Sequence, residues 1–246
     1  MHIELLGKWK PSFSFWYGTN EQSVRYLLPS GFEPQSKNGN AFWNVFFARM
    51  NQMRPAGLPV WCGIDSWLII YSIYISTRVE ASGTVNGLYV VGSQAEPKFV
   101  SKIQSVLPNL NVQPAEIDLE LQGWLLNLKI KTENLNILEI DSNVAASAFE
   151  SSSFGALQES LDFFKYRSRF LASSGDFVEF SELTDQRQRR IVDVRGEWNF
   201  LSKMNQPSLK LELATRLEPS SFYWVSGKRE RLVKTPVSVP ELAITR

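Results

Sequence analysis

The alternation of apolar and polar residues along the chain predicts a protein built mostly of β-strands. The strongest signal covers residues 66–81, SWLIIYSIYISTRVEA, where apolar side chains recur at every second position. Further strands are expected at 13–17, 41–50 and 87–93, followed by a meander from residue 115 to residue 141. The later segments GDFVEFSEL, RRIVDVRGEW, LKLELATRL and SFYWVSGKRERLV continue the pattern, and Ser226–Gly227 is expected to turn a hairpin.

Three or four short helices are expected to interrupt these strands. In residues 19–29, TNEQSVRYLLP, Thr19 and Gln22 have the spacing of a capping box and Pro29 ends the helix. Apolar residues also recur at helical spacing after Pro97 and in residues 154–166. Because the helices do not alternate regularly with the strands, we expect a mostly β (α+β) fold, a cone-shaped antiparallel barrel with an internal apolar cavity. Strand-rich chain on both sides of a Ser/Ala-rich joint at 142–153 favours one domain over residues 1–246.

The two faces of the 66–81 strand differ in character. One face carries Trp67, Tyr71 and further apolar residues and is expected to lie in the core. The other face mixes apolar residues with Ser72 and Tyr74. We therefore expect this second face to form the wall of the cavity.

Composition excludes several classes of partner and location. The chain has 246 residues, of which 43% are hydrophobic and 21% charged, and its net charge is +1. This balance provides no field that would recruit nucleic acid or an acidic membrane surface. The longest apolar run is about half a membrane span and the N-terminus has no apolar signal segment, so we expect a cytoplasmic protein.

Most catalytic and metal-binding constellations are excluded by the residue inventory. His2 is the one histidine and Cys62 the one cysteine, so neither a Ser-His-Asp triad nor a zinc site has enough members. Neither a phosphate-binding glycine loop nor an EF-hand spacing occurs. We therefore expect no cofactor and no metal, while a Mg²⁺ or Ca²⁺ site built of carboxylates alone stays an open alternative. We interpret the basic clusters at 187–190 and 228–231 as solvated strand ends and a hairpin tip.

What remains is a cavity lined by aromatic rings and hydroxyl groups, suited to a small hydrophobic metabolite with one or two polar groups. Ser72 and Tyr74 are the candidate catalytic residues, because hydroxyl groups there could donate hydrogen bonds to a carbonyl or an enolate. The candidate substrate-binding residues are the rings and cations on adjoining segments: Tyr17, Arg49, Arg54, Arg78 and Tyr89.

The order of segments resembles the acetoacetate decarboxylase-like superfamily, including its uncharacterised bacterial branch. The likeness runs through YGTNEQSVRYLLPSGFEP, AFWNVFFARMNQMRPAGLP, IIYSIYIS and NGLYVVGSQAE, and more loosely through ESLDFFKYRSRFLASSGDFVEF. The resemblance implies a cone-shaped β-barrel around an apolar pocket. It also implies, for the decarboxylases, a lysine Schiff base whose amine pKa is lowered by a neighbouring cation.

The sequence departs from the family pattern where that chemistry should be. Gly18 stands where the resemblance implies an arginine, and the central strand WLIIYSIYI carries no charge. The residue after Pro108 or Pro114, where the resemblance implies the lysine, is Asn109 or Ala115. We interpret the nearby Lys98 and Lys102 as a solvated helix face and expect no Schiff-base catalysis.

Three functions follow from this reading. The first is an enzyme of lyase, cyclase or isomerase type, acting without a Schiff base on a small apolar metabolite that bears a carbonyl or carboxylate. The second is a carrier that binds such a ligand without catalysis, and ionisable groups inside the cavity would favour the enzyme over it. The third is an interaction protein with an exposed patch of aromatic residues formed by Trp198, Phe222, Tyr223 and Trp224. A homo-oligomer is compatible with all three.

Overall fold

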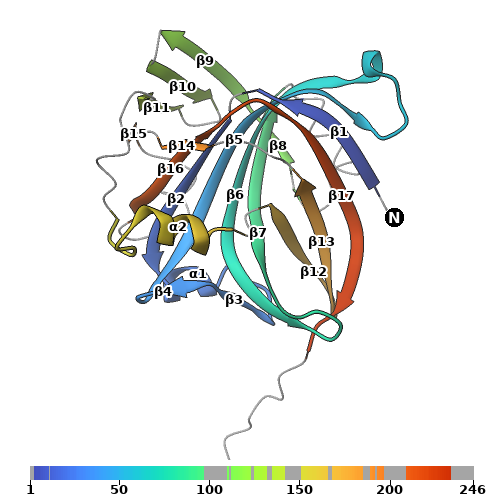
Figure 1. Ribbon diagram of the computed structural model, residues 1–246, viewed down its shortest axis with the longest axis vertical. Coiled ribbons are helices and arrows are strands. Elements are labelled where there is room, and N and C mark those ends of the chain that lie inside the picture. The colour runs from blue at the N-terminus through green and yellow to red at the C-terminus, as the bar shows by residue number, and fades with distance from the viewer. Residues whose placement is uncertain are drawn as a thin grey trace, which may run out of the picture.

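The computed structural model confirms a mostly β protein (Figure 1). It describes residues 3–10, 12–96, 110, 112–122, 125–131, 135–141, 151–165, 168–184, 189–191, 193–196 and 209–233. The elements are β1 (Ile3–Trp9), β2 (Ser12–Asn20), α1 (Gln22–Arg25), β3 (Phe32–Pro34), β4 (Ser36–Lys37), β5 (Asn40–Pro55), the 3-10 helix η1 (Val60–Cys62), β6 (Ile64–Val79), β7 (Gly83–Glu96), β8 (Val112–Pro114), β9 (Glu116–Gln122), β10 (Leu125–Lys131), β11 (Leu135–Asp141), α2 (Leu157–Phe163), β12 (Arg169–Ser174), β13 (Phe177–Thr184), β14 (Arg189–Ile191), β15 (Asp193–Gly196), β16 (Lys210–Leu217) and β17 (Ser220–Arg231).

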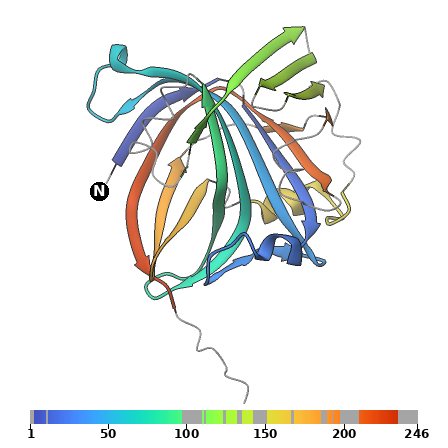
Figure 2. The same ribbon diagram turned by 180° about the vertical axis from the view of Figure 1, so that it is seen from behind.

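Seven hydrogen-bonded strands close into a ring. Their order is β5–β1–β17–β13–β12–β7–β6, and the pairing of β6 with β5 closes it. In Figures 1 and 2, β6 and β7 on one side and β17 on the other arch around β12 and β13. A separate four-stranded sheet, in the order β15–β11–β10–β9, lies at one end of the molecule (Figure 1).

The long strand β5 is the point at which the main sheet forks. One of its edges pairs with β6 from Trp43 to Met53. The other edge pairs first with β2, between Asn40 and Phe47, and then with β1, between Met50 and Pro55. The β1 branch enters the ring, whereas the β2 branch continues to β16 and β14.

Two hydrophobic clusters cover opposite faces of this sheet. On β6, Ile69, Tyr71 and Ile73 belong to one cluster, which includes Val24 of α1, and we call their side the α1 face. Ile70 and Tyr74 point the other way, into a cluster that the aromatic residues around α2 complete, and we call their side the α2 face. Both faces of β5 and β6 are therefore buried, which explains their nearly continuous apolar sequences.

The cluster on the α2 face fills the ring. It takes at least one buried side chain from each ring strand: Leu5, Met50, Leu68, Leu88, Phe170, Leu183 and Trp224. On β1, Leu5 and Trp9 are buried, while Lys8 between them is exposed. This alternation, with one face buried and one in solvent, is that of a strand at the wall of a barrel.

The main sequence-based assignments are confirmed. Residues 13–17, 41–50 and 66–81 fall on β2, β5 and β6, and the meander at 115–141 forms β9, β10 and β11. The helix expected at 154–166 is α2, although it is shorter. The described residues contain two α-helices, and the helix expected after Pro97 falls outside them.

Two local predictions are wrong. The N-cap residue of α1 is Glu21 rather than Thr19, and the Glu21 side chain forms no capping hydrogen bond. Instead, Asn20 Oδ1 accepts a hydrogen bond from the Gln22 N–H at 2.9 Å, in an Asx turn that precedes the helix. Ser226 and Gly227 do not turn a hairpin either. Strand β17 runs straight through them, and Gly227, with φ of 108°, is the extra residue of a β-bulge opposite β13.

Ring closure at β7 and β12 depends on Gly87. A Cβ atom at Gly87 would lie 2.7 Å from the carbonyl oxygen of Arg169 and 2.9 Å from Leu171 Cγ. We expect Gly87→Ala to lower the free energy of unfolding by about 1–3 kcal/mol, because overpacking here pushes the two strands apart. Urea unfolding measures this. Gly155→Ala is the control, since its Cβ would meet no atom closer than 3.8 Å, and equal losses in both variants would contradict the prediction.

Candidate functional site

Tyr74 and Ser72 lie together on the α2 face, as expected from their shared parity. The Tyr74 hydroxyl donates a hydrogen bond to the Phe163 carbonyl oxygen at 2.9 Å, and its ring meets those of Phe163 and Phe164 edge to face. The Ser72 hydroxyl donates to the carbonyl oxygen of Asn44 at 3.3 Å. Both hydroxyl groups are thus engaged in holding the fold, and their catalytic role stays a prediction.

The other predicted site residues do not join them. Tyr17 and the half-buried Tyr89 pack on the opposite, α1 face, and burial raises the pKa of Tyr89. Arg49 is exposed and lies over the ring of Trp67, 5.4 Å from its centroid. The sheet therefore separates these three residues from Ser72 and Tyr74.

Arg54 and Arg78 lie at the margins of the sheet. The Arg54 guanidinium donates to the carbonyl oxygens of Leu58 and Gln52, both at 3.0 Å, and so stabilises the turn after β5. Arg78 is exposed and lines a pocket of about 360 Å³ beside Glu33. Neither arginine reaches the ring-filling cluster.

Strands β13 and β17 bring a different set of polar groups into the ring. Ser181 and Ser226 face each other across the two strands, and Trp224 lies two residues from Ser226 on the same face. All three side chains are at least 98% buried. Within the described part of the molecule, Ser181 Oγ, Ser226 Oγ and Trp224 Nε1 have no hydrogen-bond partner. We call these three residues the ring polar group.

The ring polar group is unusual because buried polar atoms are almost always paired. Each unpaired atom costs about 1–3 kcal/mol relative to a satisfied one. Apolar side chains surround the group: Phe170 stacks on Trp224 at 5.1 Å between ring centroids, and Leu5 and Leu183 lie opposite Trp224 on the neighbouring strands. Such a setting suits a ligand that brings its own acceptors into an apolar interior.

The sequence contains a signal for part of this group. In SSFYWVS (220–226), alternate positions carry Ser220, Phe222, Trp224 and Ser226. On a strand these side chains lie on the same face, so hydroxyl groups lie beside large rings. The expectation of an exposed patch at Phe222 and Trp224 is wrong, because both are buried, and Trp198 falls outside the described residues. The position of Ser181 opposite Ser226 depends on the register between distant strands and leaves no trace in the sequence.

Helix α2 closes the α2 face beside the ring. Phe164 stacks on Trp16 of β2 with 3.9 Å between ring centroids, and Phe154 and Phe163 pack edge to face or tilted around Phe42. The segment that carries these rings, residues 151–164, is the cover of the candidate site. A ligand that enters from this side must displace aromatic rings of the cover.

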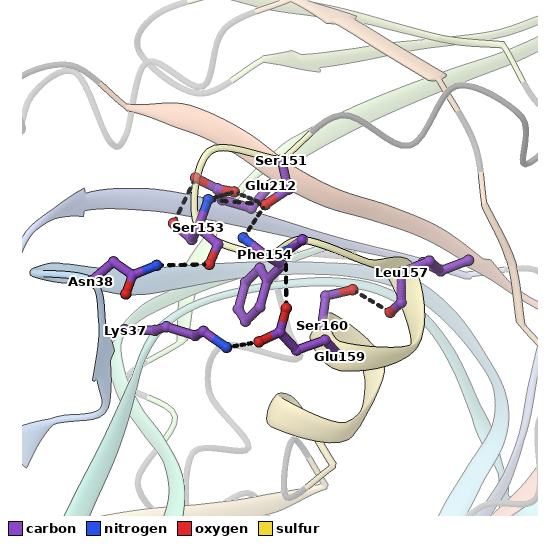
Figure 3. A network of polar contacts seen from close by, with 10 residues as sticks. Lys37, Asn38, Ser151, Ser153, Phe154, Leu157, Glu159, Ser160 and Glu212 are labelled. Atoms are coloured by element: carbon purple, nitrogen blue, oxygen red, sulfur yellow. Dashed lines mark hydrogen bonds and ion pairs between the residues drawn. The ribbon is translucent and has the colours of Figure 1, made fainter.

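A buried carboxylate fastens the cover to the sheet (Figure 3). Glu212 accepts hydrogen bonds from the backbone N–H groups of Ser152 and Ser153, at 3.0 and 3.2 Å, and from the hydroxyl groups of Ser151, Ser152 and Ser153. Asn38 bonds to the Ser153 carbonyl oxygen at 3.3 Å, which ties the same segment to the turn before β5. We call this arrangement the serine clasp.

The serine clasp also explains Gly18. Glu212 is the extra residue of a bulge in β16, and this bulge places its carboxylate beside β2. A Cβ atom at Gly18 would lie 2.7 Å from Glu212 Oε1. The arginine that the family resemblance implies at Gly18 therefore has no room while Glu212 occupies this place.

The serine clasp is a structural device rather than a base. Burial by itself raises the pKa of Glu212, but the hydrogen bonds from the serine hydroxyl and N–H groups outweigh it, so the pKa is lowered. A carboxylate of lowered pKa is a poor proton acceptor. Among the described residues, no group of three Asp, Glu, Cys or His side chains could hold a metal ion. Neither of the described helices is long and apolar enough to cross a membrane.

Solved structures with the same architecture decide the fold. The chain is similar to an acetoacetate decarboxylase-like enzyme from Sphingomonas wittichii RW1, with a TM-score of 0.61 and 12% identity over 94% of both chains. The chain has the acetoacetate decarboxylase-like fold. It is also similar to acetoacetate decarboxylase from Legionella pneumophila, with a TM-score of 0.59, 11% identity and coverage of 94% and 87%. The enduracididine biosynthesis enzyme MppR in complex with pyruvate matches with a TM-score of 0.58, 8% identity and coverage of 94% and 90%.

Sequence comparison is less informative. No family model matches the chain. The cell morphogenesis protein PAG1 of Saccharomyces cerevisiae is 30% identical over 175 residues, which cover 68% of this chain and only 7% of the yeast protein. The acetoacetate decarboxylase-like assignment therefore rests on the fold.

The serine clasp predicts a specific pH dependence of stability. We expect Glu212→Gln to lower the free energy of unfolding by about 2–3 kcal/mol at pH 7, because an amide cannot accept all five bonds. Since the folded pKa is lowered, the contribution is complete above the ordinary value of 4.5 and is lost as the pH falls below it. Urea unfolding from pH 3 to 8 measures the difference between the two proteins. Glu80→Gln, at an exposed glutamate, is the control, and a difference independent of pH would contradict the assignment.

Proposed function

We propose that the protein acts on a small, largely apolar metabolite that bears a carbonyl or a carboxylate, as a lyase, cyclase or isomerase, and binds it inside the ring. The ring polar group carries this proposal. Three neutral donors in an apolar interior can stabilise the oxygen of a carbonyl or of the enolate that forms from it. The acetoacetate decarboxylase-like fold supports a small-metabolite enzyme.

Ligand entry requires the ring to open. Ser181, Ser226 and Trp224 are buried by the surrounding side chains, so a ligand reaches them only when apolar side chains separate. The cover is the segment best placed to move, because side-chain and turn contacts hold it rather than a strand ladder. Lids that close over a substrate in this way exclude water from the reaction.

The proposed chemistry does not use a lysine Schiff base. All the lysines whose side chains are described are exposed, except the half-buried Lys37. The buried Tyr71 does not take part in the proposed site either, because it lies on the α1 face. Burial raises the pKa of its hydroxyl group, which donates a hydrogen bond to Gln94 Oε1. Lys98 and Lys102 fall outside the described residues, so their solvated role stays a prediction.

A carrier is the second candidate. The three members of the ring polar group are neutral, and a site whose polar groups do not ionise favours binding over acid–base catalysis. The enzyme and the carrier would both bind their ligand at the ring polar group, and only the enzyme would convert it. A bound metabolite that leaves unchanged after incubation would favour the carrier.

Replacement of the two serines tests the proposed site. We expect Ser181→Ala with Ser226→Ala to raise the free energy of unfolding of the ligand-free protein by about 1 kcal/mol per site, because two unpaired buried hydroxyl groups disappear. The same variant should retain less of the small molecule that native mass spectrometry detects on the gently purified wild-type protein.

The exposed Ser174→Ala variant is the control for both measurements. A double variant that loses stability and keeps its ligand would contradict the proposal. So would a wild-type protein that binds none of a panel of apolar carbonyl compounds and carboxylates.

Reductive trapping tests the absence of Schiff-base chemistry. We expect the intact mass to stay unchanged after incubation with a panel of 2-oxo and 3-oxo acids and sodium borohydride, because only a neutral lysine near the bound ketone forms an iminium. An authentic acetoacetate decarboxylase treated in parallel serves as the positive control. A stable adduct on Lys98, Lys102 or any other lysine would overturn this part of the proposal.

A further inference from the structure

A second pocket lies outside the ring interior, where β1, β5 and β17 meet at one end. Its volume is about 400 Å³, within the range of small-molecule sites. Three segments distant in the sequence form its walls: Lys8–Lys10, Asn51 and Gln52, and Pro219–Ser221. Strand pairing sets their positions, because Lys8 lies opposite both Asn51 and Ser221. We call this the end pocket.

The backbone of the end pocket is fixed in advance. Gln52 has a φ of 55°, which a residue with a side chain rarely adopts, and it lies in a bulge between β5 and β6. Asp65 holds this turn, since its carboxylate accepts bonds from the Gln52 N–H at 2.9 Å and from Asn51 Nδ2 at 3.1 Å. Strained and bulged backbone of this kind is concentrated at functional sites.

The charge of the end pocket is positive. Lys8 on β1 and Lys10, which follows the end of β1, are both exposed. Neither forms an ion pair within the described part of the chain. None of the described residues that line the pocket is acidic, and Asp65 nearby is occupied by Asn51 and Gln52. Two unpaired ammonium groups at the rim of a preformed pocket attract an oxyanion.

The remaining walls distinguish between kinds of anion. Pro219 gives the pocket an apolar side, whereas the side chain of Trp9 is buried in the ring-filling cluster. Ser221 places a hydroxyl group directly across from Lys8. The described lining of the pocket contains neither an arginine, which would bind a phosphate with two parallel hydrogen bonds, nor a helix N-terminus. An apolar wall beside point charges fits a carboxylate on a flat apolar body better than a phosphate.

We propose that the end pocket binds a small organic carboxylate, with Lys8 and Lys10 paired to the carboxylate and the apolar body against Pro219. The Ser221 hydroxyl donates a further hydrogen bond to the same carboxylate. This site is independent of the ring polar group and does not rest on the function proposed for it.

Titration calorimetry with sodium benzoate at low ionic strength tests the proposal. We expect a dissociation constant of about 1 mM for the wild-type protein, and a loss of about tenfold in affinity in the Lys8→Gln, Lys10→Gln double variant. Lys210→Gln, which removes an exposed lysine on β16, should keep the affinity within about twofold. Lys8→Arg with Lys10→Arg should restore most of it, because the charge is retained.

Three results would overturn the proposal. One is benzamide, the neutral counterpart of benzoate, binding as tightly as benzoate. Another is inorganic phosphate binding more tightly than benzoate, which would assign the pocket to phosphate. The third is benzoate failing to bind, or binding equally to the wild-type protein and the Lys8→Gln, Lys10→Gln variant. Because both lysines are exposed, thermal unfolding should show that these variants fold as the wild type does.

Discussion

The pairing of β5 with β6 is the constraint on which the rest of the structure depends. These two 16-residue strands lie side by side from Trp43 opposite Ile73 to Met53 opposite Ile64. Because β6 occupies one edge of β5 along this length, the other edge must serve both β2 and β1. The fork in the sheet follows from this sharing, with the ring on one branch and the serine clasp on the other.

The fork leaves apolar side chains on the α2 face that helix α2 covers. Where β2 leaves the ring branch, Trp16, Phe42 and Tyr74 would present their rings to solvent on the α2 face. Helix α2 is only seven residues long, too short to be stable by itself, so it depends on aromatic packing and on the serine clasp. The same dependence is the reason why we propose that the cover is the segment that moves.

The sequence predicted the strands well because alternation and apolar runs are local properties. The same logic placed Ile73 in the core and gave Ser72 and Tyr74 a common face. It failed at bulges, since one extra residue reverses the parity of all that follow. Glu212 lies two residues after the exposed Lys210, so simple alternation along the strand would place it in solvent. The bulge at Glu212 instead turns its side chain into the protein, where it is buried.

The sequence does not predict sites that depend on the register of pairing between distant strands. Ser181 lies opposite Ser226, and Lys8 opposite Ser221, only because the strands pair as they do. The predicted site residues share a chemical type, and the sheet distributes them over both of its faces and its margins. Nothing local in the sequence indicates that Tyr17 and Tyr74 face away from each other.

The two buried polar clusters show how the ring polar group should be understood. At the serine clasp, one carboxylate receives five hydrogen bonds, so the chain readily satisfies a buried polar group that serves the fold. The ring polar group has none in the described structure, although serine could be replaced by alanine at little cost to packing. Residues that reduce stability are retained where function needs them, as active sites commonly show. The contrast between the two clusters, within one protein and on one face of its sheet, favours a ligand as the missing partner in the ring.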